Sequence, residues 1–562
     1  MAYYYVSKGE TSTGIILNED YMTVLDGGVA IETTANEYGV LYVWSGGTAN
    51  STTVNAGGEF HISSGGTANK VKIDSGDLTV YRGGAVTEIE WTPCVGSVTV
   101  ENGAHATFAS TYTGVYYGSD GQLIESTTEP MNDRKLNDER QSMYVMSDGI
   151  ANRTVVYFSG CQHVCSGGTV NSTWVRAEGN LLVSSGGTAS DTTLDAYSNM
   201  AVFSGGAANN TIVNSGTFNL SGGVADGVTL NANGGLLIED GGKADNVAIK
   251  PQGTLVVSSG SANVTEWTPG KGNVMLYGDA QVTFASEYSG VYYGDGENLI
   301  SSAAEMNDAY LDANYYELYV MNGGRAINTT VDYYSYMAIF SGGTADVVSV
   351  GEGATLFVNS GGTANSATMI GRWGSAYVNS GGTANSATVN SDCFLNVYGL
   401  TDFTAVNSGG RFTILKTGKA DHTPVNSDGR LQVYGSAENT AISGGSALVL
   451  DGKMTGTELT AFGMSAGYLD VSSGGAVENT TVNADCRLFI FKNGTAINTT
   501  VNEYGSMYVS GSAENTTISG GEVLISSGGT MTKTTVDPNG VFTIYEGGSA
   551  DSATIAWLRV SR

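Results

Sequence analysis

Hydrophobic residues recur at fixed distances from pairs of adjacent glycines along most of the chain. Five and three residues before the first glycine of a pair come two apolar residues, as Leu41 and Val43 before Gly46. Alternation with a period of two is typical of a short strand with one buried face. We therefore predict a strand before each glycine pair, with the same two positions at Phe60/Ile62, Leu78/Val80, Leu181/Val183 and Met337/Ile339.

A second alternating pair follows each glycine pair. Six and eight residues after Gly46 come Thr52 and Val54, then Asn55, and the small residue Ala49 lies between the two predicted strands. Glycine permits the positive φ of a tight turn, and a small residue fits an inward corner. Because Asn or Asp recurs after the second strand, we expect stacked Asn side chains to hydrogen-bond to one another along the chain of repeats.

The repeating unit is about 19 residues long. Two short strands cannot bury an apolar face alone, but copies stacked in parallel enclose a continuous narrow core. The sequence therefore predicts an all-β fold, a parallel β-solenoid (β-helix), with about two dozen coils of this length. No helical period competes with this pattern over a long stretch.

Two related segments interrupt the repeat, one from Trp91 and one from Trp267, and both contain Trp-Thr-Pro, Phe-Ala-Ser and Gly-Val-Tyr-Tyr-Gly. We divide the chain into solenoid repeats at 1–90, an insert at 91–142, solenoid repeats at 143–266, an insert at 267–317 and solenoid repeats at 318–562. The polar stretches 129–141 and 305–316 are expected to form a short helix or a projecting loop. Such inserts are either oversized structural coils or binding loops on a rigid scaffold.

The inserts contain the residues that we select as candidate ligand-binding residues. Tyrosine rings can stack on sugar rings, although tyrosine is also common on strands for its propensity alone. The candidates are Tyr112, Tyr116, Tyr117, Tyr288, Tyr292 and Tyr293.

Composition and charge narrow the class of protein. The chain has 80 Gly but only 6 Pro, so it is not collagen-like, and its 14% of charged residues is not typical of disordered chains. Its net charge of -30 repels polyanions, so we expect no nucleic acid as a partner. The sequence contains no apolar run of 18 residues, so we predict no membrane insertion.

The sequence offers only weak candidates for catalytic and metal-binding residues. The acids Glu125, Glu129, Asp133, Asp138 and Glu139 lie in the first insert, but the second insert keeps only part of this pattern. Cys161 and Cys165 flank His163 without a second pair of zinc ligands. The repeat lacks the regular Asp of a calcium-binding roll. We predict no enzyme activity, no catalytic residues, no metal and no cofactor.

The repeat itself resembles a known family. The stretches SGGTANSTTVN from Ser45, SGGTASDTTLD from Ser185 and SGGTANSATVN from Ser380 are similar to the stalk repeats of AIDA-type autotransporter adhesins, in the passenger domain. The resemblance implies a secreted or surface-displayed bacterial β-helix for adhesion, aggregation or biofilm formation. It also implies sugars added to Ser and Thr by a dedicated heptosyltransferase. The family's signal peptide and translocator barrel are not visible in the sequence, so the export route stays open.

From these observations we expect an extracellular or cell-surface adhesin-like stalk. Its expected partners are host or bacterial glycans, further copies of itself and a bacterial glycosyltransferase acting on the repeats. The alternative is a polysaccharide-degrading or glycan-binding β-helix protein whose site lies at the inserts.

Overall fold

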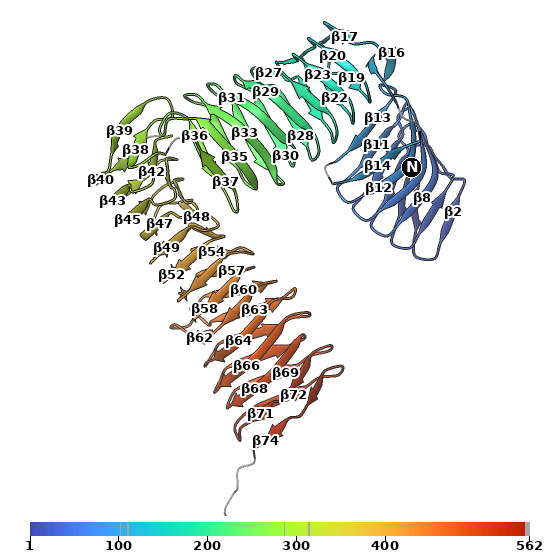
Figure 1. The fold of residues 1–562 in the computed structure, drawn as a ribbon. Coiled ribbons are helices and arrows are strands. Elements are labelled where there is room, and N and C mark those ends of the chain that lie inside the picture. The colour runs from blue at the N-terminus through green and yellow to red at the C-terminus, as the bar shows by residue number, and fades with distance from the viewer. Residues whose placement is uncertain (102, 110–111, 286, 313–314, 557–562) are drawn as a thin grey trace, which may run out of the picture. The chain divides into compact units, whose positions relative to one another are not determined.

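The computed structural model describes residues 1–101, 103–109, 112–285, 287–312 and 315–556. All regular elements within these residues are strands, and none of them is a helix that could cross a membrane. The chain forms two compact units: unit 1 comprises Met1–Trp267 with Gln281–Ala285, and unit 2 comprises Thr268–Ala280 with Ser286–Arg562. In each unit, strands stack coil upon coil (Figure 1). The predicted parallel β-solenoid is confirmed.

A single coil illustrates how the sequence pattern becomes structure. Strand β7 (Val40–Val43) leads into the glycine turn, and β8 (Thr48–Asn55) follows it. Leu41, Val43 and Val54 have no exposed surface, and Tyr42 and Thr53, which alternate with them, are half-buried. The alternation that predicted two strands thus marks the side chains of the core.

Successive coils pair in parallel and in register. Leu41 of β7 pairs with Phe60 of β9 (Glu59–Ile62), which pairs with Leu78 of β11 (Asp77–Val80). On the other side of the coil, β8 pairs with β10 (Thr67–Asp74), which pairs with β12 (Ala85–Trp91). Like residues therefore lie above like residues, and the core is a narrow column of Leu, Val, Ile and Ala.

The glycine turn needs both of its glycines. Gly46 has a φ of 77°, in the left-handed region that favours glycine. A Cβ atom on Gly47 would lie 2.6 Å from the carbonyl oxygen of Val24 in the preceding coil. The first glycine thus permits the turn, and the second permits the close approach of neighbouring coils.

The part of the coil after the glycine turn consists of two straight segments, whereas the sequence predicted one strand. A left-handed residue, Ser386 with a φ of 55°, separates β49 (Thr383–Asn385) from β50 (Thr388–Val389). Ser51 takes the same conformation inside β8, with a φ of 58°. Each coil therefore has three straight segments, and the interpretation with two strands per coil was incomplete.

The number of coils is also higher than expected, about 29 turns in place of about two dozen. Coils with a single glycine at the turn before the second strand do not fit the pattern. For example, β58 (Ser436–Glu438) and β61 (Lys453–Thr455) are neighbouring rungs in which Ala437 pairs with Met454. Gly435 and Gly452 precede these strands singly, and the coil is shorter than 19 residues.

Each insert contains an antiparallel hairpin that covers the first edge of the stack that follows it. In unit 1, the hairpin strand β15 pairs antiparallel with the first long strand of the next stack, and in unit 2, β38 does the same. An uncovered edge strand is prone to pair with other chains, so the hairpins protect these edges. The strands are β15 (Val115–Ser119), β16 (Gln122–Thr127) and β19 (Gln141–Val145) in unit 1, and β38 (Val291–Gly294), β39 (Leu299–Ala303) and β42 (Glu317–Val320) in unit 2.

Residues 129–141, 305–312 and 315–316 of the polar stretches do not form the expected helix or projecting loop, and residues 313–314 lie outside the described residues. The first contains β17 (Met131–Asn132) and β18 (Lys135–Leu136), which pair in parallel with the next coil. The second contains β40 (Glu305–Asn307) and β41 (Tyr310–Leu311), which do the same. Met131, Leu136 and Leu311 are buried, so these stretches are the first coils of the stacks that follow.

Candidate functional site

Asparagine side chains form hydrogen-bonded columns along the turns that end the coils. The Nδ2 of Asn55 donates to Oδ1 of Asn36 at 2.7 Å, and Asn36 donates in the same way to Asn18 at 2.7 Å. In unit 2, Asn426 donates to Asn407 and Asn407 to Asn390, both at 2.8 Å. The predicted stacking of Asn is confirmed, and it gives the surface a regular row of amide groups.

A second polar column follows the corner between the two short segments after the glycine turn. In unit 1, Asn171 donates to Asn152 at 3.0 Å, and Asn152 donates to Asn132 at 2.8 Å. In unit 2, Asn385 donates to Asn365 at 2.9 Å, and Asn365 donates to Asp346 at 2.7 Å. Where Asn or Asp occupies this corner on consecutive coils, the same donors and acceptors repeat at the spacing of β-strands, about 4.8 Å.

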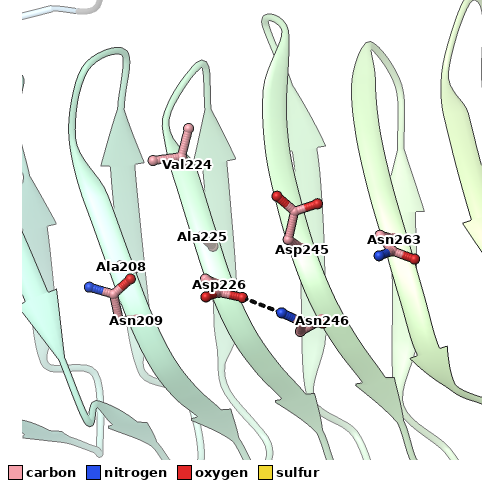
Figure 2. Close-up of a pocket in the computed structure, with 8 residues that line it drawn as sticks. All are labelled: Ala208, Asn209, Val224, Ala225, Asp226, Asp245, Asn246 and Asn263. Carbon is pink, nitrogen blue, oxygen red and sulfur yellow. Dashed lines mark hydrogen bonds between the residues drawn. The ribbon is translucent and has the colours of Figure 1, made fainter.

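This second column borders a shallow groove of about 390 Å³ on the outer surface of unit 1 (Figure 2). Asn209, Asp226, Asp245 and Asn263 lie on consecutive coils along it, and Asn246 donates to Asp226 at 2.6 Å. The groove is lined mainly by amides and carboxylates, which can hydrogen-bond to a ligand rich in hydroxyl groups.

The tyrosines of the first insert pack into the protein. The hydroxyl of Tyr112 accepts a hydrogen bond of 3.1 Å from the backbone N–H of Trp91, and its ring meets that of Tyr116 edge to face at 6.2 Å. Tyr117 is buried, with Arg134 over its ring at 4.9 Å. These contacts stabilise the hairpin against the stack.

The tyrosines of the second insert are half-buried in the same way. Tyr288 meets Tyr292 edge to face at 6.3 Å, and Tyr293 meets Tyr316 at 5.5 Å. The two sets of three tyrosines belong to different units. Glycan binding at the six rings stays a prediction.

Three of the acidic candidates of the first insert, Glu125, Asp133 and Asp138, are paired with arginines, and Glu129 and Glu139 are exposed. Arg153 donates to both carboxylate oxygens of Asp133 at 2.7 Å, which lowers the pKa of Asp133. Arg140 likewise lowers the pKa of Asp138, and Arg134 contacts Glu125. A general acid needs a raised pKa, so the pairing of Asp133 and Asp138 opposes that role.

Cys161, His163 and Cys165 lie together in β22 (Cys161–Val164) and the turn after it. Burial lowers the pKa of His163 to about 4 and raises the pKa of both thiols to about 12. The imidazole stacks on Tyr144 with ring centroids 4.3 Å apart. His163 is therefore a neutral packing residue, and thiols with such a high pKa are poor metal ligands at neutral pH.

Sequence reasoning did not single out Glu317, the most unusual acid of unit 2. It is almost completely buried beside Tyr319 and Tyr336, whose hydroxyls hydrogen-bond to each other. Burial raises the pKa of the Glu317 carboxyl to about 8, although hydrogen bonds from the two tyrosines oppose the shift.

Within the described residues, Asp402, Asp421 and His422 bring three potential metal ligands within 4.8 Å of one another. The Nδ1 of His422 lies 3.2 Å from Oδ1 of each carboxylate. The same oxygens accept backbone hydrogen bonds from Phe403 at 2.9 Å and from His422 at 2.8 Å. The group is exposed and internally hydrogen-bonded, so we assign no ion to it.

Comparisons with known proteins place this solenoid in no family. No family model matches the sequence, and no curated protein matches it. Among solved structures, it is similar to a TibC-catalysed hyper-glycosylated TibA fragment, with 18% identity, coverage of 98% of this chain and 99% of that chain, and a TM-score of 0.19. It is also similar to the PL6 family alginate lyase AlyGC, with 10% identity, coverage of 99% and 96%, and a TM-score of 0.14. TM-scores this low support no argument about function, and the fold assignment rests on the strand pairing.

A group of exposed aromatic residues at the turns also escaped sequence reasoning. All have left-handed backbone, which costs a residue other than glycine about 1–2 kcal/mol. Their exposed fractions range from 49% to 81%. The structure therefore holds large apolar rings in solvent at positions where Gly, Asn or Asp would turn the chain at lower cost. They are Tyr38, Phe158, Tyr197, Tyr334, Trp373 and Tyr504.

Proposed function

We propose that this chain is a non-enzymatic, adhesin-like stalk that is secreted by bacteria or displayed on their surface. It mediates adhesion, autoaggregation or biofilm formation by presenting the same polar groups many times. The observation that carries the proposal is the pair of Asn-rich columns, which repeat donors and acceptors from coil to coil on the outer surface. Weak contacts repeated at a fixed spacing add to a strong attachment through avidity.

The composition of the surface supports contact with glycans or with other copies of the chain. Only 14% of residues are charged and the net charge is -30, so Asn, Ser and Thr provide much of the solvation. Polyanions are repelled by such a surface. The resemblance of the repeats to AIDA-type stalks points in the same direction.

The turns also offer acceptor sites for a bacterial glycosyltransferase. Ser45, Ser64 and Ser185 precede glycine pairs, and all three are exposed. Such serines repeat along one edge of the coils. Sugars attached there would project into solvent without disturbing the core, so we propose O-glycosylation at these Ser-Gly-Gly turns.

Display of the full chain on a non-aggregating bacterium tests the adhesive role. Cells that carry the chain should clump or attach to glycan-coated surfaces, and cells that carry an unrelated surface protein should not. Intact mass of the protein from its native host tests glycosylation, since additions in multiples of a sugar mass are expected. Absence of both clumping and attachment contradicts the adhesive role.

Incubation with a panel of polysaccharides tests the non-enzymatic role. The chain lengths of the polysaccharides should remain unchanged. Cleavage that is lost in Asp133→Asn or Glu139→Gln would replace the stalk proposal with a polysaccharide-degrading enzyme whose site is in the first insert.

A further inference from the structure

Two exposed aromatic rings share one column of turn residues in unit 2. The backbone N–H of Tyr334 donates to the carbonyl of Glu352 at 3.2 Å, and the N–H of Gly353 donates to the carbonyl of Arg372 at 3.0 Å. Tyr334, Gly353 and Trp373 therefore occupy equivalent places on three successive coils.

The residue between the two rings leaves room for an aromatic side chain. A Cβ atom on Gly353 would lie 2.6 Å from ring carbons of Tyr334, so the tyrosine ring extends along the column over the glycine. Tyr334 remains 54% exposed and Trp373 49% exposed. The result is an open aromatic surface that runs along the stacking direction of the coils.

The turn does not require aromatic residues at these places. Tyr334 and Trp373 have φ values of 60° and 64°, in the region that favours glycine. The same column continues with Asp392 and Gly409 in the following coils. Neither ring lies in the core, so packing inside the coil does not offset the free-energy cost of their left-handed backbone.

Polar and charged groups border the rings. The guanidinium of Arg372 lies over one face of the Trp373 ring, 4.5 Å from its centroid, and Glu352, the residue before Gly353, is exposed. Aromatic faces beside charged hydrogen-bonding groups suit a sugar, which has apolar ring faces and hydroxyls at its edge. The net charge of -30 favours a neutral glycan over an acidic one.

The spacing of the column selects the kind of glycan. Tyr334 and Trp373 are two coils apart, which is roughly 9.6 Å. One pyranose of an extended β-1,4-linked chain is about as long as one coil is high, and successive rings face opposite ways. Successive sugars of such a chain can therefore lie one to a coil along the column.

We propose that Tyr334, Gly353 and Trp373 form a binding site for an extended, neutral, β-1,4-linked glycan that lies along the column. The site rests on the proposed adhesive function and names its ligand class. Tyr334 and Trp373 stack on sugar rings, Gly353 leaves room for the ring of Tyr334 to lie along the column, and Arg372 and Glu352 hydrogen-bond to hydroxyl groups.

Titration of the full chain with oligosaccharides, followed by calorimetry and tryptophan fluorescence, tests the site. The probes are cellohexaose and chitohexaose, with the α-linked maltohexaose as the ligand control. At least one β-linked hexasaccharide should bind and change the fluorescence, and Tyr334→Ala or Trp373→Ala should weaken binding at least tenfold. Trp373→Phe should restore part of the affinity, because the aromatic face remains.

Tyr38→Ala is the matched control, since Tyr38 is an exposed aromatic residue with left-handed backbone in unit 1, and its backbone N–H donates to the carbonyl of Gly57. It should bind as the wild type does, and the melting temperatures of all variants should stay within a few degrees of the wild type. Equal binding by the wild type and both alanine variants would overturn the site, as would preference for maltohexaose or absence of binding to either β-linked probe.

Two further results separate this site from the adhesive function. If cells displaying Trp373→Ala still attach to glycans as well as the wild type, the adhesive function stands and this site is wrong. If the variants lose only self-association, measured by analytical ultracentrifugation, the aromatic surface is a contact between proteins and the glycan site is wrong.

Discussion

The side chain of Asn407 donates a hydrogen bond of 2.8 Å to Asn390 and accepts one of 2.8 Å from Asn426. A single residue therefore links three coils at the surface. Each coil lacks a core of its own, so contacts between neighbouring coils stabilise the fold.

Replacement of Asn407 tests how much these columns contribute. Asn407→Asp keeps the shape of the side chain but removes the donor to Asn390, and it places a carboxylate against an acceptor. We expect unit 2 to lose about 1–3 kcal/mol of unfolding free energy, measured by chemical denaturation. Asn396→Asp on the outer side of β51 (Phe394–Val397) is the control and should cost less. Equal losses in the two variants would show that the column does not stabilise the stack.

Gly241 and Gly242, two adjacent glycines in unit 1, are needed for different reasons, one for its backbone conformation and the other for close packing between coils. Gly241 has a φ of 81° and open space where a Cβ atom would lie, whereas a Cβ atom on Gly242 would lie 2.4 Å from the carbonyl oxygen of Leu220. Gly241→Ala should therefore cost about 1–2 kcal/mol from its backbone alone. Gly242→Ala should cost more, because neighbouring coils must separate. Thermal unfolding of both variants measures the difference, and a larger loss for Gly241→Ala would contradict this assignment.

Unit 1 should lose stability in acid because of His163. Its pKa is lowered to about 4 in the folded protein, whereas the unfolded chain has the ordinary value of 6.5. Between these values the unfolded chain binds the proton first, so stability is fully present above pH 6.5 and falls toward pH 4. The loss is on the order of 3 kcal/mol.

His163→Leu should remove this part of the acid sensitivity, since Leu182 occupies the paired position in the next coil. Denaturation of the wild type and the variant at pH 7 and pH 4.5 measures it. The same loss of stability in both proteins would show that His163 is not the responsible group.

Unit 2 should respond to pH in the opposite direction through Glu317. The pKa of its carboxyl is raised to about 8 in the folded protein, above its ordinary value of 4.5. The folded state therefore holds the proton more tightly, and stability falls as pH rises from 4.5 to 8. Glu317→Gln should make unit 2 less sensitive to pH in this range and more stable at pH 8. Unfolding curves at pH 5 and pH 8 measure this difference. If the variant keeps the pH dependence of the wild type, the pKa of Glu317 is not raised as described.

The tyrosines of the inserts distinguish packing from ligand binding. Tyr112→Phe keeps the ring but removes the acceptor for the N–H of Trp91, and should cost about 1 kcal/mol of stability. Tyr116→Ala removes an edge-to-face contact with Tyr112 and should lower the melting temperature further. If Tyr116→Ala instead keeps its melting temperature and loses glycan binding, the rings form a ligand site.

The repeat allowed much of the fold to be predicted, because each coil copies the same buried positions. Leu41 and Val43 are followed in register by Phe60 and Ile62, so the period in the sequence is the period of the stack. The corner that divides the second strand has a less regular signature. Asn210, Asn246 and Asn498 adopt left-handed backbone there, which Asn tolerates well, but Lys70, Phe403 and His422 do so too.

The candidate site was less predictable than the fold. Tyr334 and Trp373 stand where other coils have Gly or Asp, so the repeat pattern treated them as turn residues. The two residues share a column only because their coils pair, and these coils differ in length, so a fixed period in the sequence does not align them. The first coils at 129–141 and 305–316 were missed for a related reason, since strands of two or three residues are too short to show alternation.

The most direct test of the adhesive account measures attachment and glycan length in the same sample. Cells displaying the full chain are mixed with beads that carry a β-1,4-linked glycan, and the glycan is then released and sized. The account predicts that the cells attach to the beads and that the glycan keeps its length. Failure to attach to glycans and to one another, or attachment accompanied by progressive shortening of the glycan, would contradict it.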